Sequence, residues 1–350
     1  MSRLLIGNFD FEHSLAAAGQ PLPGGLRRIV AELACSWGVA AQTGDALWSP
    51  DPVNRAFLER IEQSGLPAMT IASSVEDVPP GMALVPWGWT AEVVALGRSL
   101  GALIDAPSLN VVRRLNARRF SHQQEQRLGV GLPGAAIVES LSELKAAIEA
   151  LPASFDGWVV KAEFSNSSRE RFVHRGRQPF DVDALTRWAK SRLTRGHAVF
   201  VEPWVDRVEE VGVQLTVPQN GQPYVEGVTR LLVDDAGRFL GCEFTPAIDH
   251  DPAWTDAVTV GLKVAAIAQQ DGYFGPMGID AMRYRLPNGE ERLRPLQDVN
   301  ARWTMGRLSL GLRRLLSHEG ESVPSWDRGT FHVKPAIAVE LGNADQTHRI

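Results

Sequence analysis

Residues 273–306 constrain the fold of this chain most, because they read as two neighbouring strands joined by a tight turn. Apolar and polar residues alternate in the first half, as in a half-buried strand, and the Pro-Asn-Gly at 287–289 is a strong turn signal. Side chains alternate along a strand, so Asp298, Asn300 and Arg302 of the returning strand share one face. The pattern predicts a β-hairpin with polar side chains gathered on one side.

Asp280 on the first strand of this hairpin is expected to lie on the same face as Asp298 and Asn300. Mg²⁺ prefers hard oxygen ligands and usually shares them with substrate phosphates. Two carboxylates and an amide beside the guanidinium of Arg302 therefore predict a site for a metal and a nucleotide. A hairpin that is merely capped by Asp and Asn, with its Arg in solvent, fits the same spacing, and the pattern alone does not separate the two.

The size of the chain indicates more than one folding unit. Its 350 residues, of which 44% are hydrophobic, exceed the length at which a single core usually stops growing, so two or three subdomains are expected. The net charge of -5, from 36 basic and 41 acidic residues, gives no electrostatic reason to expect nucleic acid as the main ligand.

Cysteine usage and hydropathy indicate the cellular environment. Cys35 and Cys242 are too far apart in sequence for a metal or redox motif, and two isolated thiols favour a reducing compartment. The start of the chain reaches Asn8 and Asp10 after only a short apolar run, which does not fit a signal peptide. The sequence also lacks the roughly 20 consecutive apolar residues of a membrane helix. We therefore expect a cytoplasmic protein that works without a membrane.

The first third of the chain reads as a small α/β unit. Buried strands are expected at 4–7, 68–72 and 82–86, and an amphipathic helix is expected to begin at Gly24. Strands that alternate with helices form a parallel sheet with helices on both faces. The two tryptophans of the turn at 86–90 could form the rim of a ligand site, although packing is the commoner role of such a pair.

Two later stretches could hold a nucleotide. A strand that ends in Lys161 leads into a small polar loop, and such a loop can cradle phosphate with backbone N–H groups while the Lys supplies charge. A strand that ends at Glu202-Pro203 predicts a linker, because Pro cannot extend a central ladder. A carboxylate beyond that linker, such as Glu209, could bind ribose hydroxyls. By itself, each residue also fits a solvated strand end.

In this order the motifs resemble the ATP-grasp superfamily of carboxylate–amine ligases, over roughly residues 111–310. The resemblance implies an α/β, ATP-grasp fold. An N-terminal α/β pre-ATP-grasp domain at 1–110 would precede an ATP-grasp domain at 111–350, whose two α+β subdomains clasp ATP. The nucleotide lid would occupy about 150–203 and the metal-binding subdomain about 204–350.

The resemblance also implies roles for single residues. Arg302 and Lys161 would be catalytic, the first beside the transferred phosphoryl group and the second on the nucleotide phosphates. The metal ligands would be Asp280, Asp298 and Asn300. Besides Lys161, the nucleotide-binding residues would be Arg118, Ser165, Ser167, Ser168, Glu202, Trp204, Val205 and Glu209. The implied cofactors are ATP and Mg²⁺, which Mn²⁺ could replace.

Three departures from the superfamily's pattern bear on these roles. Arg118 stands where a Lys is expected to contact phosphate, and the phosphate loop at 165–169 is poor in Gly. Asp298 replaces the Glu of a Glu-x-Asn metal motif, and its shorter side chain could still bind one ion. The substrate side is expected near Asn8, Asp10, Asn116 and the turn at 86–89, because ligands of α/β sheets collect at the carboxyl ends of strands.

The implied activity is ATP-dependent formation of an amide or peptide bond. ATP would phosphorylate a substrate carboxylate, and an amine would attack the acyl phosphate to give the amide, ADP and phosphate. The partners would be a small-molecule carboxylate and an amine, such as glutamate in cofactor or peptide biosynthesis, without nucleic acid or membrane, and the chain could form a homodimer. The alternatives are a non-catalytic ATP-binding homologue that acts as a partner or scaffold, and another ATP-grasp phosphoryl-transfer enzyme.

Overall fold

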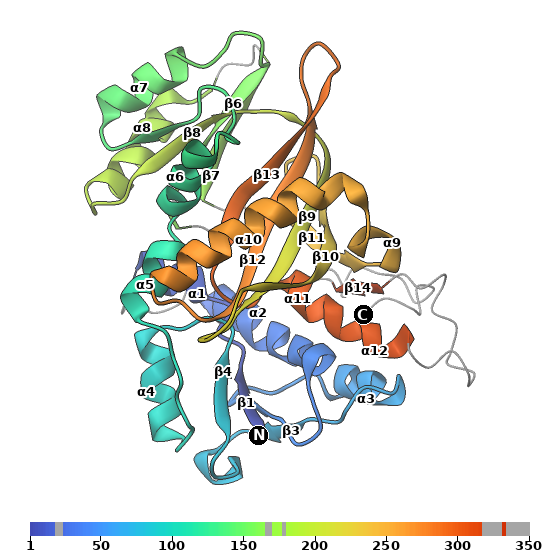
Figure 1. The fold of residues 1–350 in the computed structure, drawn as a ribbon. Helices are drawn as coiled ribbons and strands as arrows, with labels where there is room; N and C mark the ends of the chain where they lie inside the picture. Colours follow the sequence, from blue (N-terminus) through green and yellow to red (C-terminus); the bar gives the residue numbers. More distant parts are fainter. Residues whose placement is uncertain (18–23, 165–169, 177–179, 317–330, 334–350) are drawn as a thin grey trace.

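The computed structural model describes residues 1–17, 24–164, 170–176, 180–316 and 331–333, and three sheets organise this part of the chain (Figure 1). The N-terminal residues form a parallel sheet, drawn in blue. The middle of the chain forms an antiparallel lid sheet, drawn in green, and the later residues form a larger antiparallel sheet, drawn in yellow to red. The large sheet lies between the other two.

The N-terminal sheet has the parallel order β3-β2-β1-β4. Its strands are β1 (Arg3–Ile6), β2 (Ala46–Trp48), β3 (Thr70–Ala72) and β4 (Ala83–Pro86). Its helices are α1 (Phe11–Ala16), α2 (Gly24–Ala34), α3 (Arg55–Gln63) and α4 (Ala91–Ser99), with short 3₁₀ turns at Cys35–Ala40 and Val75–Asp77. Leu4 and Leu5 are both fully buried, as expected for a parallel strand covered on both faces. The expected strands and helix are confirmed, and β2 is an addition to them.

The lid sheet has the antiparallel order β5-β8-β6-β7. It follows α5 (Leu109–Leu115) and α6 (Arg118–Leu128), and comprises β5 (Ala136–Val138), β6 (Gly157–Ala162), β7 (Arg171–Arg175) and β8 (Val199–Pro203), with helices α7 (Leu141–Glu149) and α8 (Val182–Leu193). Because β5 pairs with β8, the lid sheet begins before residue 150. Ser140 caps α7, since its Oγ accepts from Glu143 N at 3.2 Å. Pro203 ends β8, where the linker to the large sheet begins.

The large sheet has the order β13-β12-β9-β10-β11-β14 and is antiparallel throughout. Its strands are β9 (Asp206–Val217), β10 (Tyr224–Val233), β11 (Phe239–Phe244), β12 (Gly275–Arg285), β13 (Glu291–Asn300) and β14 (Phe331–Val333). Its helices are α9 (Pro246–Asp249), α10 (Thr255–Gln270), α11 (Met305–Ser309) and α12 (Arg313–Leu316), with 3₁₀ turns at Pro252–Trp254 and Leu310–Leu312. The hairpin of β12 and β13 is the one that the sequence predicts, and Gly289 takes the positive φ of 87° in its turn.

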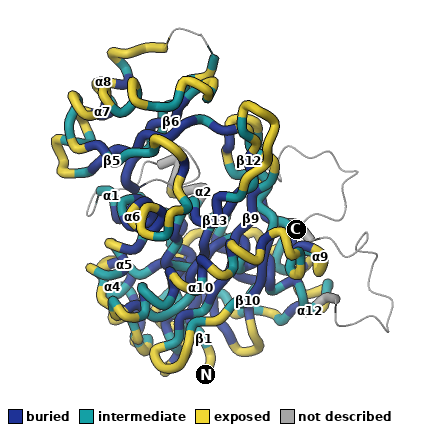
Figure 2. Tube along the Cα trace, turned by 45° about the horizontal axis from the view of Figure 1, so that its top comes forward, coloured by how far each residue is buried: buried dark blue, intermediate teal, exposed yellow. Residues whose placement is uncertain are grey.

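The main core lies between the large sheet and α10. Val213, Leu215 and Ile279 are fully buried beneath this helix, and Ala257 and Val264 of the helix are fully buried above them. Figure 2 shows the resulting run of buried residues along β9 and β13, with exposed residues mainly in loops and outer helices. One face of the sheet is thereby closed by α10, and the opposite face carries Asp280.

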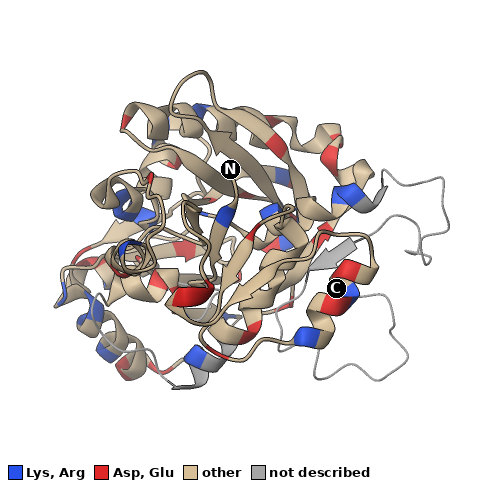
Figure 3. Ribbon diagram, turned by 90° about the horizontal axis from the view of Figure 1, so that it is seen from below, with Lys and Arg blue, Asp and Glu red and all other residues tan. Residues whose placement is uncertain are grey.

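The charged residues of both signs are interspersed over the side of the molecule shown in Figure 3. This arrangement agrees with the small net charge of -5. None of the described helices is both long enough and apolar enough to span a bilayer.

Candidate active site

The acidic face of the β12–β13 hairpin forms as the alternation of its residues predicts. Asp280 and Asp298 lie directly opposite each other, and Asn300 lies opposite Gly278, so all these side chains share one face. Asn300 Nδ2 donates to Asp280 Oδ2 at 3.2 Å, and Arg302 Nη2 donates to Asn300 Oδ1 at 2.9 Å. The structure thus brings together the three proposed metal ligands and the proposed catalytic Arg.

Arg118 joins this face to the lid. It begins α6 and is 9% exposed, and its Nη2 lies 3.1 Å from Asp298 Oδ2. Its Nε donates to the carbonyl of Ala162 at the end of β6, at 3.3 Å. Ser121, one turn further along α6, donates from Oγ to Asp298 Oδ1 at 3.2 Å. A buried guanidinium therefore stands where the lid sheet, α6 and the hairpin meet.

The donor set at this face suits a divalent cation. Burial first, and repulsion from Asp298 second, raise the pKa of Asp280 to about 7, and a cation bound between the two carboxylates would favour the charged form of both. Asn300 turns its amide nitrogen toward Asp280, so its oxygen could face a cation only after the amide turned over. Within the described residues, no group of three or more His, Cys, Asp or Glu side chains could hold a metal ion, so two carboxylates and one amide are the candidate ligands.

A buried network of charges holds Lys161. Its Nζ lies 2.5 Å from Glu202 Oε2, between the neighbouring lid strands β6 and β8. Glu202 Oε1 also accepts from Arg294 Nη2 of β13 at 2.9 Å, and Arg294 Nε donates to Glu125 Oε1 of α6 at 2.5 Å. Burial, followed by the nearby Arg118 and Arg294, lowers the pKa of Lys161 to about 8 against the opposing effect of Glu202.

The linker between β8 and β9 is built around Trp204 and Val205. Trp204 N donates to the carbonyl of Gly157 at 2.9 Å, which ties the linker to β6. The guanidinium groups of Arg175 and Arg207 lie over the Trp204 ring at 4.2 and 4.3 Å, within the range of cation–π interactions. Val205 is 5% exposed and packs in an apolar cluster of the large sheet and the lid. The linker is therefore fixed to both sheets.

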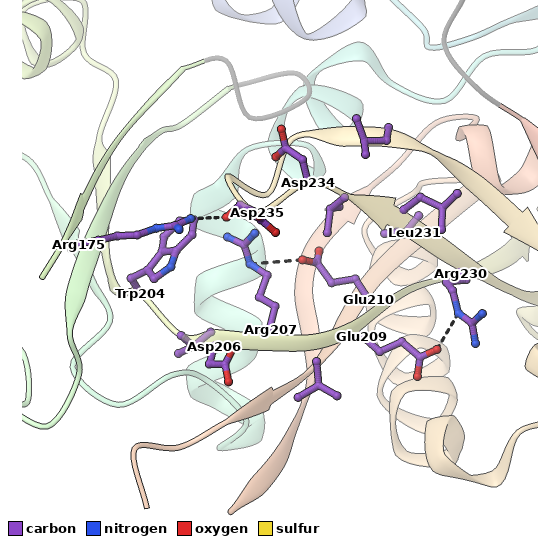
Figure 4. Close-up of a pocket in the computed structure, with 15 residues that line it drawn as sticks. Arg175, Trp204, Asp206, Arg207, Glu209, Glu210, Arg230, Leu231, Asp234 and Asp235 are labelled. Atoms are coloured by element: carbon purple, nitrogen blue, oxygen red, sulfur yellow. Dashed lines mark hydrogen bonds and ion pairs between the residues drawn. The ribbon is translucent and has the colours of Figure 1, made fainter. Parts of the chain in front are cut away.

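A cavity of about 920 Å³ opens beside this linker (Figure 4). It lies between β7 of the lid, the linker, and the strands β9 and β10 of the large sheet. Its volume falls in the range of roughly 300–1,000 Å³ that is typical of small-molecule sites. The lining residues are Arg175, Trp204, Val205, Asp206, Arg207, Val208, Glu209, Glu210, Arg230, Leu231, Leu232, Val233, Asp234, Asp235 and Leu240.

The register of β9 bears on the expected role of Glu209 as the ribose-binding carboxylate, which remains a prediction. Consecutive residues of a strand face opposite ways, and Glu210 is the one on the face of Asp280. Its Oε1 lies 3.3 Å from Arg207 Nε, whereas Glu209 Oε1 accepts from Arg230 at 2.7 Å on the other face (Figure 4). Strand parity therefore places Glu210, the residue after Glu209, on the face of Asp280.

The two asparagines expected on the substrate side both form hydrogen bonds with backbone groups of neighbouring segments. Asn8 Nδ2 donates to the carbonyl of Gly88 at 2.8 Å, which joins the ends of β1 and β4. Asn116 Oδ1 accepts from Ala301 N at 2.9 Å, so it fixes the segment between Asn300 and Arg302. Both side chains therefore position the loops of the site.

Trp87 packs in the interior. It is 5% exposed, and its ring lies 4.4 Å from that of Phe9 and 6.4 Å from that of Trp37. Its carbonyl accepts from Trp303 N at 2.9 Å, and the guanidinium of Arg302 lies 5.5 Å from its ring. Packing is thus its main role, and the packed ring also supports Arg302.

Glu12 is a candidate site residue that the sequence patterns do not reveal. It lies in α1 and is 7% exposed, and its Oε1 accepts from Arg302 Nε at 2.6 Å. Its position just after the first strand, at the carboxyl end of the parallel sheet, is the one signal that could have indicated it. Ser165, Ser167 and Ser168 lie outside the described residues, so their expected contact with phosphate remains a prediction.

Comparisons with known proteins find similar solved structures but no significant match in sequence. No protein-family profile matches the sequence, and no curated protein matches it significantly. Among solved structures, biotin carboxylase from Campylobacter jejuni, a β-γ-ATP complex, is 14% identical with a TM-score of 0.52, over 93% of this chain and 72% of that chain. Phosphoribosylamine–glycine ligase from Thermotoga maritima is 13% identical with a TM-score of 0.51, over 88% and 70%. Pyruvate carboxylase from Rhizobium etli is 14% identical with a TM-score of 0.53, over 89% of this chain and 27% of that chain.

At a sequence identity of 13–14%, similarity to these solved structures shows a shared fold alone. The match extends over most of the chain, so it includes the parallel N-terminal sheet as well as the lid sheet and the large sheet. These features agree with the architecture that the motifs predict, and this chain has the ATP-grasp fold.

Proposed function

We propose that this protein is an ATP-dependent ligase that joins a carboxylate to an amine through an acyl phosphate. The observation that carries the proposal is the set of cations at the junction of the lid sheet, α6 and the acidic hairpin face. Arg118 of α6 contacts Asp298, Arg302 contacts Asn300 beside Asp280, and Lys161 of the lid sheet lies close enough to Arg118 for their charges to interact. Phosphoryl transfer depends mainly on positioning and charge neutralisation, which such a set can provide without a side-chain nucleophile.

The phosphates of ATP would lie between the lid and the hairpin. Lys161 and Arg118 would hold the nucleotide phosphates, and the planar guanidinium of Arg302 would hold oxygens of the transferred group in a fork. Asp280 and Asp298 would hold Mg²⁺, joined by Asn300 once its amide has turned. When bound, Mg²⁺ would neutralise phosphate charge.

The nucleoside would occupy the cavity beside the linker. Glu202 is already bonded to Lys161 and Arg294, so the linker would contact the base through backbone groups and through Trp204 and Val205. Glu210 would accept from the ribose hydroxyls. The biotin carboxylase that resembles this chain is a β-γ-ATP complex, which supports a nucleotide in this fold.

The chemistry would proceed in two balanced steps. A carboxylate oxygen of the substrate attacks the γ-phosphorus, and the bond to ADP breaks with its electron pair leaving on ADP. The amine then attacks the acyl carbon, phosphate departs with the C–O bonding pair, and the amine nitrogen loses a proton. An acyl phosphate hydrolyses if water reaches it. Arg171 and Arg175 of β7 donate to the carbonyls of Ala236 and Asp235, which holds the lid edge against the large sheet.

Binding and turnover can be tested separately. Calorimetry with Mg·ATP should show saturable binding to the full chain. ADP release should then require a carboxylate from a panel that includes glutamate, and hydroxylamine should trap the acyl phosphate as a hydroxamate. Binding without ADP release for any carboxylate would favour the non-catalytic alternative, and absence of binding would exclude a nucleotide site.

A further inference from the structure

Only one of the two carboxylate oxygens of Glu12 has a hydrogen-bond partner among the described residues. Its Oε1 accepts from both Nε and Nη2 of Arg302, and the first of these contacts measures 2.6 Å. Its Oε2 is buried and has no hydrogen-bond partner among the described residues. An unpaired buried oxygen is destabilising, because it loses its contacts with water and gains none in return. The free oxygen therefore points to a ligand that donates hydrogen bonds.

The charge balance around Glu12 narrows the chemistry of this ligand. Arg302 is the cation that balances Glu12, but Arg302 also reaches Asn300 beside the acidic pair. When a bound anion forms an ion pair with Arg302, the positive charge of Arg302 is shared between that anion and Glu12, so Glu12 is less fully neutralised. An ammonium group restores that charge and brings only donors, so it suits a carboxylate oxygen better than a hydroxyl group does.

We propose that Glu12 Oε2 is the subsite for an ammonium group carried by the carboxylate substrate. The inference rests on the proposed ligase function and specifies its substrate class, an α-amino acid that is activated at its carboxylate. Arg302 would hold the transferred phosphoryl group and is in direct contact with Glu12, so the carboxylate that attacks this group and an ammonium group bound at Glu12 must be close neighbours in one substrate. An amino group on the carbon next to the carboxylate satisfies this condition. Glu12 is thus a specificity-determining residue.

Glu12→Gln tests the subsite with little change in shape. The Gln carbonyl can still accept from Arg302, whereas the amide N–H₂ that replaces Oε2 is a donor and repels an ammonium group. The measurement is kcat/KM for hydroxamate formation with an α-amino acid and with the carboxylic acid of the same skeleton that lacks the amino group. Loss of one charged hydrogen bond should reduce kcat/KM for the amino acid by about 10- to 100-fold. The rate with the des-amino acid should fall much less, because it reports only the change at the contact with Arg302.

Two further variants complete the experiment. Glu12→Asp keeps the charge, but its shorter side chain moves the carboxylate away from the subsite. This variant should therefore retain part of the preference for the amino acid. Glu62→Gln removes an exposed carboxylate of α3 in the same domain and should leave the preference intact. Equal losses with both acids in Glu12→Gln would mean that Glu12 only positions Arg302, and the subsite would be rejected.

A binding measurement separates this proposal from the proposed function. Calorimetry with a non-hydrolysable ATP analogue and Mg²⁺ should show that the wild type binds the amino acid more tightly than the des-amino acid. Glu12→Gln should abolish that difference while the affinity for the analogue stays unchanged. If this binding pattern were observed but no acyl phosphate formed, the subsite would be supported and the proposed ligase activity would be rejected. An equal affinity of the wild type for the two acids would overturn the subsite.

Discussion

Arg294 and Glu202 form a buried ion pair that links the hairpin of the large sheet to the last strand of the lid sheet. Arg294 Nη2 lies 2.9 Å from Glu202 Oε1, and the two side chains are 1% and 6% exposed. Arg294 also bonds Glu125 of α6, and Glu202 also bonds Lys161. One connected set of charges thus couples the lid, α6 and the hairpin, so the position of Lys161 depends on a residue of another subdomain.

Arg294→Met should destabilise the protein strongly. Removal of the guanidinium leaves Glu125 and Glu202 buried without their main partner, and breaking a buried pair in this way typically lowers the free energy of unfolding by about 3–5 kcal/mol. Denaturation by urea at neutral pH, followed by circular dichroism, measures the change. Arg283→Met is the matched control, because Arg283 pairs with Glu291 near the exposed turn of the same hairpin. A loss of similar size in the control would show that burial of the Arg294 pair is not the cause.

The sequence predicted the hairpin and its acidic face because both follow from local patterns. Alternation along a strand fixes which residues share a face, and the turn at 287–289 fixes which strands pair. Asp280, Asp298 and Asn300 could therefore be placed together before the structure was known. The order of the three units followed from the motifs in the same way.

Partners that are distant in sequence could not be predicted. Glu12 lies 290 residues from Arg302, and Glu125 lies 169 residues from Arg294, so no periodicity relates them. Their contacts arise from the packing of one subdomain on another. Our proposal gives the role expected of Glu209 to Glu210 for a different reason, since a shift of one residue along a strand turns a side chain to the opposite face.

Glu210→Gln should weaken the binding of ATP more than the binding of 2′-deoxy-ATP. Glu210 lies on the inner face of β9 and would accept from ribose hydroxyls, so loss of one charged hydrogen bond should raise the Kd of ATP by about tenfold or more. The Kd of the deoxynucleotide should change less if the 2′-hydroxyl is the group recognised. Glu209→Gln is the control, because Glu209 is bonded to Arg230 on the other face. A stronger effect of the control than of Glu210→Gln would contradict the observed register.

The affinity for ATP should fall as the pH rises from 7 to 9. The pKa of Lys161 is lowered to about 8, chiefly by burial, so the free protein loses this ammonium charge within that window and the attraction for phosphate is lost with it. Because bound phosphate favours the charged form, binding near pH 8 should take up protons from the buffer. Calorimetry in buffers of different ionisation enthalpy measures this uptake. Lys161→Met should bind ATP weakly and show little pH dependence over this range, and a Met variant with the full wild-type pH profile would assign the titration to another group.

Asp298→Asn should impair metal binding while the fold persists. The substitution keeps the size of the side chain and an oxygen for Ser121, but removes one charge from the pair that would hold Mg²⁺. We expect the Mn²⁺ affinity, followed by electron paramagnetic resonance with ATP present, to fall by about tenfold or more and turnover to fall further. Asp256→Asn, at the exposed start of α10 on the other side of the large sheet, provides the control. Wild-type Mn²⁺ affinity in the Asp298 variant would mean that the hairpin face is structural.

Arg302→Lys should slow acyl-phosphate formation far more than it weakens ATP binding. Arg302 lies over the ring of Trp87 and donates to Asn300 at 2.9 Å, which places its guanidinium beside the acidic pair. A Lys keeps the charge but cannot hold two phosphate oxygens in a planar fork. The lost contact strengthens as charge redistributes in the transition state, so kcat should fall and the Kd of ATP should stay nearly constant. Rapid-quench measurement of the first turnover of ADP separates these effects. If the variant instead kept its first-turnover rate and only raised the KM of the carboxylate, Arg302 would serve to bind the substrate carboxylate, and Lys161 or Arg118 would be the cation that acts on the transferred phosphoryl group.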